Sequence, residues 1–310
     1  MAILIDPPAW PAHGTLWSHL VSDSDYDELH AFAKHLGIPR RSFDLDHYDV
    51  PAARYEQAVA LGARAVTAKD VVHQLRKSGL RVRQVERETV TPVRRRQYLT
   101  SEWTELGALL GTVDSHRADD WHHLGEHLIA RWNEPHRSYH DERHLEDVLL
   151  ALDHLATRGE RLSPATLLAA WFHDAVYTGT PESDELGSAH LATTSLNGLS
   201  IDPNLVSQVG EFIVATIPAR EVPDPAAPLA HLLDADLSIF AAAPHRYEQY
   251  AVAVRAEYAH VPEADFAAGR SRILSSYLEQ PAIYRTGAAQ LLWERRAREN
   301  VSAEVKRLRG

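Results

Sequence analysis

The stretch Leu167-Leu168-Ala169-Ala170-Trp171-Phe172-His173-Asp174-Ala175-Val176-Tyr177 places two polar residues inside an otherwise apolar run. A run that is apolar on most sides predicts a helix that is buried on most of its faces. Because burial of a lone carboxylate is costly, the pair His173 and Asp174 needs a partner. A bound cation would supply it, and a structural hydrogen bond between the two side chains is the alternative.

Another segment brings two histidines onto an apolar helix face. The stripe formed by Val148, Leu152 and Leu155 extends backward at helical spacing to His144 and, one turn earlier, to His140. Both histidines are therefore expected to face the core from one helix.

A third helix carries an acidic residue on its apolar face. Leu229, Leu233 and Phe240 mark that face, Asp236 is in register with them, and Asp234 falls off it. Taken singly, each inward polar residue could be a hydrogen-bonded core residue. Together, two imidazoles and two carboxylates make a mixed nitrogen and oxygen ligand set that suits a divalent transition metal or Mg²⁺.

The composition limits the chemistry that the chain can use. Its 310 residues include 19 histidines but no cysteine, which excludes a disulfide framework, a thiolate zinc site and a cysteine nucleophile. Any bound metal must therefore use histidine and carboxylate ligands. With 32 basic and 43 acidic residues the net charge is −11, which disfavours nucleic-acid binding by the surface as a whole.

The pattern of elements changes along the chain and predicts two domains. Residues 1–80 alternate strand-like and helix-like runs, which favours a small α/β domain with a parallel sheet. Residues 81–98 are expected to form a basic linker, and the helical periodicity of residues 99–310 predicts an all-α domain. The expected strands of the first domain are 2–5, 41–48 and 63–67, and its expected helices are 26–35, 52–61 and 69–77.

Two further features concern partners and location. Positions 76–98 hold eight Arg and Lys residues against Glu86 and Glu88, which indicates a solvated linker or a local phosphate-binding patch. The patch would make the protein a nucleic-acid factor. The start lacks a signal-peptide pattern and no apolar run approaches the roughly 20 residues that span a bilayer, so we expect a cytoplasmic protein without a membrane segment.

In its motifs the second domain resembles the HD superfamily of metal-dependent phosphohydrolases, and most of all a bacterial branch of predicted metal-dependent HD phosphohydrolases. The resemblance covers roughly residues 100–308 and rests on four motifs in order. They are Glu134-Pro135-His136-Arg137-Ser138-Tyr139-His140 running into Arg143-His144, Trp171-Phe172-His173-Asp174-Ala175-Val176-Tyr177, Leu233-Asp234-Ala235-Asp236-Leu237-Ser238-Ile239, and Ile283-Tyr284-Arg285-Thr286.

This resemblance implies an α-helical bundle in which His144, His173, Asp174 and Asp236 hold one divalent metal ion. The ligand set leaves the metal open among Mn, Fe, Co, Ni, Zn and Mg. The resemblance further implies that metal-activated water hydrolyses a phosphate ester of a nucleotide or related small phosphorylated metabolite, either a monoester or a diester.

The resemblance also implies roles around the metal. Asp174 would both bind the ion and orient the water. Glu185 would shuttle the proton, with a solvated first helix turn as the alternative. His140 and Arg143 would contact the phosphate or support the ligands, and a surface salt bridge is the alternative for Arg143.

The chain departs from the family pattern at one place. Many relatives carry Ala-Thr-Lys-x-His where this chain has Ala215-Thr216-Ile217-Pro218-Ala219, so that Ile217 and Ala219 replace the Lys and the His. A mononuclear site or an altered substrate would follow. The same departure favours the alternative function, a non-catalytic sensor that binds a phosphorylated small molecule.

The first domain is similar, over about residues 2–80, to a small bacterial domain of unknown function, which implies no activity. The similar segments are 3–6, 16–20, 28–33 and 46–49. A second polar or metal site could form from Asp6, His19, His30, His47 and Asp49. Alternatively, Trp17 and His30 serve packing or hydrogen bonding, and the domain binds a ligand or regulates the other one.

Overall fold

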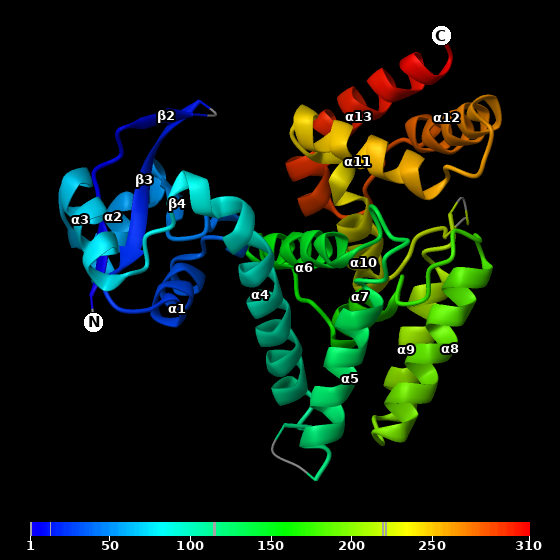
Figure 1. Cartoon of the computed structure of the whole chain (residues 1–310), viewed down its shortest axis with the longest axis horizontal. Coiled ribbons are helices and arrows are strands. Elements are labelled where there is room, and N and C mark those ends of the chain that lie inside the picture. The colour runs from blue at the N-terminus through cyan, green and yellow to red at the C-terminus, as the bar shows by residue number, and fades with distance from the viewer. Residues whose placement is uncertain (1, 13, 114–115, 219, 221) are drawn as a thin grey trace. The chain divides into compact units, whose positions relative to one another are not determined.

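The computed structural model describes residues 2–12, 14–113, 116–218, 220 and 222–310. The chain divides into two units, Met1–Arg96 and Gln97–Gly310 (Figure 1). The first unit combines a sheet with helices and the second is helical, as the sequence predicts.

The first unit is built on a mixed sheet, and the prediction of a parallel sheet is wrong. Its strands are β1 (Ile3–Ile5), β2 (Trp10–Ala12), β3 (Thr15–Ser22), β4 (Tyr48–Pro51) and β5 (Arg64–Ala65). Only the pair β1 and β5 is parallel among the described strands, whereas β3 pairs antiparallel with β1, β2 and β4. The hairpin of β2 and β3, which the sequence analysis did not identify, reverses the chain before the first helix.

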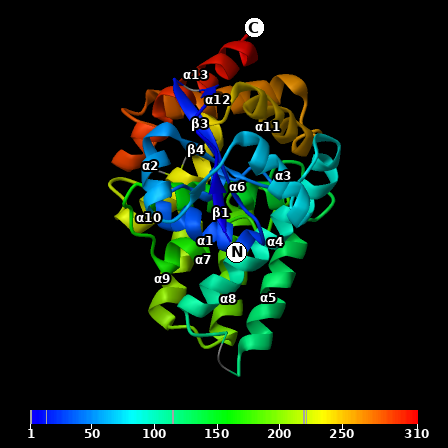
Figure 2. The same ribbon diagram turned by 90° about the vertical axis from the view of Figure 1, so that its left-hand side faces the viewer.

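Helices cover both faces of this sheet. Alternate residues of β1 point to opposite faces, so Ile5 packs with α1 (Tyr26–Leu36) and α2 (Ala52–Ala60), while Leu4 packs with α3 (Ala68–Ser78). Figure 2 shows α2 and α3 on opposite sides of the strands. The three helices match the predicted helices to within two residues at either end. The strand expected at 41–48 is instead a 3-10 turn, Arg40–Ser42, and a loop into β4.

The stretch 81–98, expected as a linker, is largely helical. A 3-10 turn, Gln84–Glu86, leads into α4 (Arg87–Leu109), which contains the boundary between the two units. Its β-branched residues and Pro92 have low helix propensity, which is why the sequence does not predict a helix here. Arg81 pairs with Asp46 at 2.9 Å, and Arg94 lies over the Tyr26 ring at 4.1 Å, so this basic stretch is in part engaged with the first unit.

The second unit is all-α, as predicted, and is organised around one large apolar core. Within it α6 and α7 pack against α10, and α9 packs against α7 and α8. Among the described residues, no helix has both the length and the apolar character to cross a membrane. The remaining helices are α5 (Ala118–Arg131), α6 (Glu142–Ala156), α7 (Pro164–Phe172), α8 (Ser183–Gly198), α9 (Pro203–Val214), α10 (Ala227–Asp236), the 3-10 helix Leu237–Ala241, α11 (Pro244–Glu257), α12 (Glu263–Glu279) and α13 (Gly287–Leu308).

Candidate metal centre

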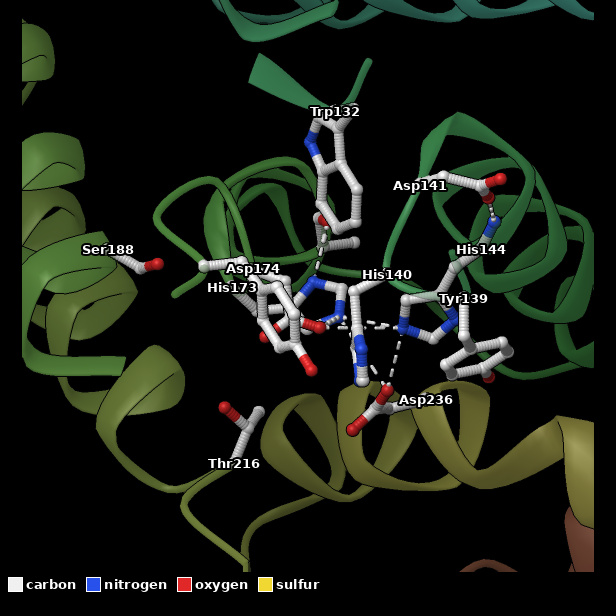
Figure 3. A network of polar contacts seen from close by, with 12 residues as sticks. Trp132, Tyr139, His140, Asp141, His144, His173, Asp174, Ser188, Thr216 and Asp236 are labelled. Carbon is white, nitrogen blue, oxygen red and sulfur yellow. Dashed lines mark hydrogen bonds and ion pairs between the residues drawn. The ribbon is translucent and has the colours of Figure 1, made fainter. Parts of the chain in front are cut away.

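Three helices of the second unit bring four side chains to one point (Figure 3). His144 lies on the first turn of α6, His173 and Asp174 directly follow α7, and Asp236 is the last residue of α10. Both histidines are buried, and the side chains of the two aspartates are 15% and 22% exposed. We call these four residues the central cluster.

The donor atoms of the central cluster are spaced as ligands of one ion would be. The His144 Nε2 atom lies 3.2 Å from His173 Nε2 and 3.2 Å from Asp236 Oδ1. Asp174 Oδ2 lies 3.3 Å from His173 Nε2 and 3.6 Å from His144 Nε2. Donors bound at 2.1 Å in tetrahedral or octahedral geometry are about 3.0–3.4 Å apart. Two nitrogens facing each other at this spacing are also poor hydrogen-bond partners unless one is protonated.

The end of α7 orients the His173 ring. The prediction that the His-Asp pair lies inside a helix running to Tyr177 is wrong, because α7 ends at Phe172 and His173 caps it. The His173 Nδ1 atom lies 2.9 Å from the Ala170 carbonyl oxygen and donates to it when protonated, which leaves Nε2 for the cluster. The Trp132 ring packs against the imidazole at 5.4 Å and excludes water from that side.

A helix cap positions His144. The Asp141 carboxylate accepts hydrogen bonds from the backbone N–H groups of Arg143 and His144 and so starts α6. His140 therefore precedes the helix and reaches the site from a loop, contrary to its predicted place one turn earlier on the same helix. Its ring still lies 5.6 Å from that of His144.

The charges of the central cluster balance only when a cation is present. Burial acts to lower the pKa of His173, but the carboxylates of Asp174 and Asp236 outweigh it and raise that pKa to about 9. Burial likewise acts to raise the pKa of Asp236, and the two imidazoles hold it well below its usual range. The central cluster thus stabilises positive charge between its carboxylates, a role that a proton or a metal ion can fill.

A buried glutamate side chain, which the sequence does not predict as part of the site, holds His140. Glu257, the last residue of α11, lies 2.7 Å from His140 Nδ1 and accepts a hydrogen bond from the Tyr177 hydroxyl at 3.0 Å. The backbone N–H groups of residues 138–140 donate to its other oxygen. Burial acts to raise the pKa of Glu257, yet these bonds lower it to about 2. Glu257 is 117 residues from His140, so no local spacing pointed to it.

Glu185 lies buried on the first turn of α8. Burial raises its pKa, and the negative charge of Asp174 adds to the effect. Its Oε2 atom has no hydrogen-bond partner among the described residues. The expected alternative of a solvated helix turn is therefore wrong, and a pKa raised by burial is a property that acid–base residues share.

Two arginines, Arg137 and Arg143, belong to the segment that carries His140 and His144. Arg143 is half-buried beside His144, and its role stays a prediction. Arg137, which was not singled out, donates hydrogen bonds to the carbonyl oxygens of His140 at 2.8 Å and Asp174 at 2.7 Å. Its guanidinium thus ties the loop that carries His140 to the loop that carries the His-Asp pair.

Asp234, the residue off the apolar stripe, has a structural role. It is fully buried and accepts hydrogen bonds from the backbone N–H groups of Arg285 and Thr286 and from the Thr286 hydroxyl. Thr286 in turn caps α13. The fourth quoted motif therefore anchors a helix to the end of α10, two residues before Asp236.

Thr216, which immediately precedes the first departure from the expected motif, lies near the central cluster. Figure 3 shows Thr216 across from Asp174 on the side of the site away from Trp132. The Thr216 hydroxyl donates to the Ile213 carbonyl oxygen at 2.7 Å. Ile217 follows it, and Ala219 lies outside the described residues.

The first unit brings together part of the second polar site expected there. His19, His47 and Asp49 offer donor atoms within 4.8 Å of one another, and Asp6 lies 2.9 Å from His19 Nδ1. His30 does not join them. Its Nδ1 atom lies 3.0 Å from the Tyr48 hydroxyl, as the hydrogen-bonding alternative predicted.

Comparison with known proteins concerns the first unit alone. No curated protein and no solved structure matches the chain. Residues 3–78 match the family described as "Protein of unknown function (DUF4031)", so the first unit carries a domain of that family.

Proposed function

We propose that the protein is a metal-dependent phosphohydrolase of the HD type. The observation that supports this most is the central cluster, in which two imidazole nitrogens and two carboxylate oxygens converge at 3.2–3.6 Å. Its donor set fits a divalent ion because one imidazole is oriented through its second nitrogen and two carboxylates supply the negative charge. The order of the four quoted motifs supports the same assignment.

The reaction that we propose is hydrolysis of a phosphate ester of a small metabolite. His144, His173, Asp174 and Asp236 would hold a divalent ion, which would supply Lewis-acid polarisation of a phosphoryl oxygen and lower the pKa of water. Asp174 orients the attacking water, and Glu185 accepts its proton, since a raised pKa strengthens a carboxylate as a base.

We propose that His140 acts on the leaving group of the substrate. Burial opposes a positive charge on this imidazole, but the hydrogen bond with Glu257 outweighs burial and raises the pKa of His140. The protonated ring can therefore bind a phosphoryl oxygen or donate a proton to the departing oxygen. The half-buried Arg143 is the proposed second contact for phosphate.

A non-catalytic sensor of a phosphorylated small molecule is the second candidate. The observation in its favour is the sequence, in which Ile217 and Ala219 stand in place of a Lys and a His. Such a sensor would keep metal and ligand binding and would lack turnover. A nucleic-acid factor is a weaker third candidate, because Arg81 and Arg94 of the basic stretch contact Asp46 and Tyr26.

The test combines metal analysis with turnover. The tag-free protein is reconstituted with Mn, Fe, Co, Ni, Zn or Mg and assayed for phosphate release from a panel of phosphorylated metabolites and from the p-nitrophenyl mono- and diesters. The double variant His173→Ala, Asp174→Ala should lose the metal of the central cluster and the activity. The matched control is His127→Ala, Asp120→Ala, whose two residues are exposed on α5.

Three outcomes separate the candidates. Metal-dependent phosphate release that the first double variant abolishes supports the hydrolase. Stoichiometric binding of a phosphorylated compound without turnover supports the sensor. Equal metal content and activity in the two double variants would overturn the assignment of the central cluster.

A further inference from the structure

A second group of metal-ligating side chains lies in the first unit, on two paired strands. His19 of β3 is the direct partner of Asp49 of β4, and His47 immediately precedes β4. Their donor atoms lie within 4.8 Å of one another. We call His19, His47 and Asp49 the N-terminal cluster. Figure 1 shows β3 and β4 next to each other in this unit.

A buried carboxylate orients the His19 ring. Asp6, at the end of β1, is 1% exposed, and its Oδ2 atom lies 2.9 Å from His19 Nδ1. Its other oxygen accepts a hydrogen bond from the backbone N–H of His19 at 2.5 Å. The Nδ1 atom of His19 is therefore occupied as a donor, and Nε2 is the nitrogen left to bind a ligand.

A second buried carboxylate, that of Asp46, orients the His47 ring in the same way. Asp46 Oδ1 lies 2.6 Å from His47 Nδ1. Asp46 is itself fixed, because its other oxygen accepts from Arg81 at 2.9 Å and from the backbone N–H of Val82 at 2.7 Å. Burial and these partners thus hold the His47 ring so that Nε2 faces Asp49.

The ligand atoms of the N-terminal cluster are spaced as if around an ion, and they are too far apart for direct hydrogen bonds. His47 Nε2 lies 3.6 Å from Asp49 Oδ1, which is beyond hydrogen-bond distance. The two imidazole rings lie 5.0 Å apart, edge to face. Histidines that bind metals characteristically donate their second N–H to a carboxylate, as both rings do here. A surface ion pair requires neither the duplicated buried carboxylate nor two histidines whose ligand atoms lie within 4.8 Å of one carboxylate oxygen.

We propose that His19, His47 and Asp49 bind a divalent transition-metal ion, with Asp6 and Asp46 as positioning residues. Two imidazoles and one carboxylate suit Zn, Fe, Co, Ni or Mn. The side chains of the cluster are 26%, 14% and 46% exposed, so an ion can enter from solvent. Three protein ligands leave at least one coordination position for water or a small anionic ligand.

The test measures metal binding in the full-length, tag-free protein. Co²⁺ serves as the probe because its visible absorption reports the ligand set, and Zn²⁺ competition gives the affinity. In the background His173→Ala, Asp174→Ala, which disables the central cluster, we expect one equivalent of Co²⁺ to remain. Adding Asp49→Asn should weaken its binding at least 10-fold, and Asp6→Asn should weaken it by about 10–100-fold.

Matched substitutions keep the result interpretable. His73→Gln removes an exposed histidine of α3 in the same unit and should leave the bound Co²⁺ unchanged. If the double background fails to fold, the same comparison is made in the otherwise unchanged chain, where Asp49→Asn should reduce the Co²⁺ stoichiometry by one equivalent.

Two results would overturn the proposal. One is a folded central-cluster variant that binds no Co²⁺. The other is that one equivalent of Co²⁺ binds, but Asp49→Asn, Asp6→Asn and His73→Gln change its affinity equally. Because the two clusters are measured separately, loss of one assignment leaves the other standing.

Discussion

The Oε2 atom of Glu257 lies 2.7 Å from Nδ1 of His140, and the Tyr177 ring stacks on the same imidazole at 4.3 Å. The glutamate is 1% exposed. These contacts fix both the plane of the His140 ring and the nitrogen that it turns toward the central cluster. A loop residue is thereby held as firmly as one on a helix.

Neutralising Glu257 should change the pH dependence of turnover. The carboxylate raises the pKa of His140, so Glu257→Gln should lower that pKa. If protonated His140 assists the leaving group, the alkaline limb of the kcat profile moves to lower pH, and kcat near neutrality falls by about 10–100-fold. Metal content should stay the same. A profile that moves equally in Glu263→Gln, a control at an exposed glutamate of α12, would contradict this role.

Glu185→Gln should affect the acidic limb of the pH profile of kcat. Burial raises the pKa of Glu185, and a base acts only when ionised, so activity should increase as pH rises through that pKa. The glutamine variant should lose about 10²–10⁴-fold in kcat and should flatten the acidic limb. Glu182→Gln, at an exposed position just before α8, should retain both. Loss of metal from Glu185→Gln would instead assign this residue to the ligand set.

Helical periodicity was sufficient to place the residues of the central cluster that lie on helices. His144 and Asp236 stand in register with buried leucines, and the cost of burying charge singled out His173 and Asp174. Periodicity did not predict the positions of residues that lie at helix ends or in loops. Spacing predicts that His140 lies on a helix, but this helix begins only after Asp141, since spacing alone does not locate an N-cap.

Long-range partners were beyond the reach of local patterns. Glu257 and Arg137 act through hydrogen bonds that include backbone groups 119 and 37 residues away along the chain, and spacing within their own segments does not predict these contacts. The prediction of a parallel sheet fails for a related reason. The parallel pairing inferred from strand and helix alternation holds for β1 and β5 only, because the short hairpin of β2 and β3 contains Pro11, which weakens its strand signal.

Acid should destabilise the first unit through His30. Burial, with the positive charges of Arg40 and Arg94, lowers the pKa of His30 to about 3. The unfolded chain, with an ordinary value near 6.5, binds a proton that the folded unit excludes, so stability falls as pH drops from about 6.5 toward 3. Between pH 7 and pH 4 the loss is at most about 3 kcal/mol.

Urea unfolding followed by circular dichroism across this range measures the effect. His30→Asn should flatten the part of the pH dependence that His30 causes, while keeping an acceptor for the Tyr48 hydroxyl. His35→Asn, at an exposed position of the same helix α1, should behave as the unaltered protein does. Parallel curves for the three proteins would contradict the assignment.

Two glycines allow α4 and α5 to approach closely around a pair of tryptophans. The Trp103 and Trp121 rings stack at 4.1 Å, and each indole N–H donates to the backbone carbonyl oxygen of the other residue. A Cβ atom at Gly125 would lie 2.3 Å from the Trp103 ring, and one at Gly107 would lie 2.3 Å from the Trp121 ring. Each of these contacts is with a rigid ring in a packed core, so it cannot relax without separating the helices.

Gly125→Ala should therefore destabilise the second unit by about 1–3 kcal/mol, the usual cost of overpacking, even though alanine is the better helix former. Gly269→Ala on α12 provides the control, because a Cβ there meets nothing within 4 Å. That substitution should stabilise the protein by about 0.5–1 kcal/mol through helix propensity alone. Urea unfolding measures the free energy of unfolding of both variants. If α4 and α5 approach closely, this free energy should fall in Gly125→Ala and rise in Gly269→Ala. Gains of equal size at both positions would mean that the two helices separate readily and that the tryptophan pair does not fix their distance.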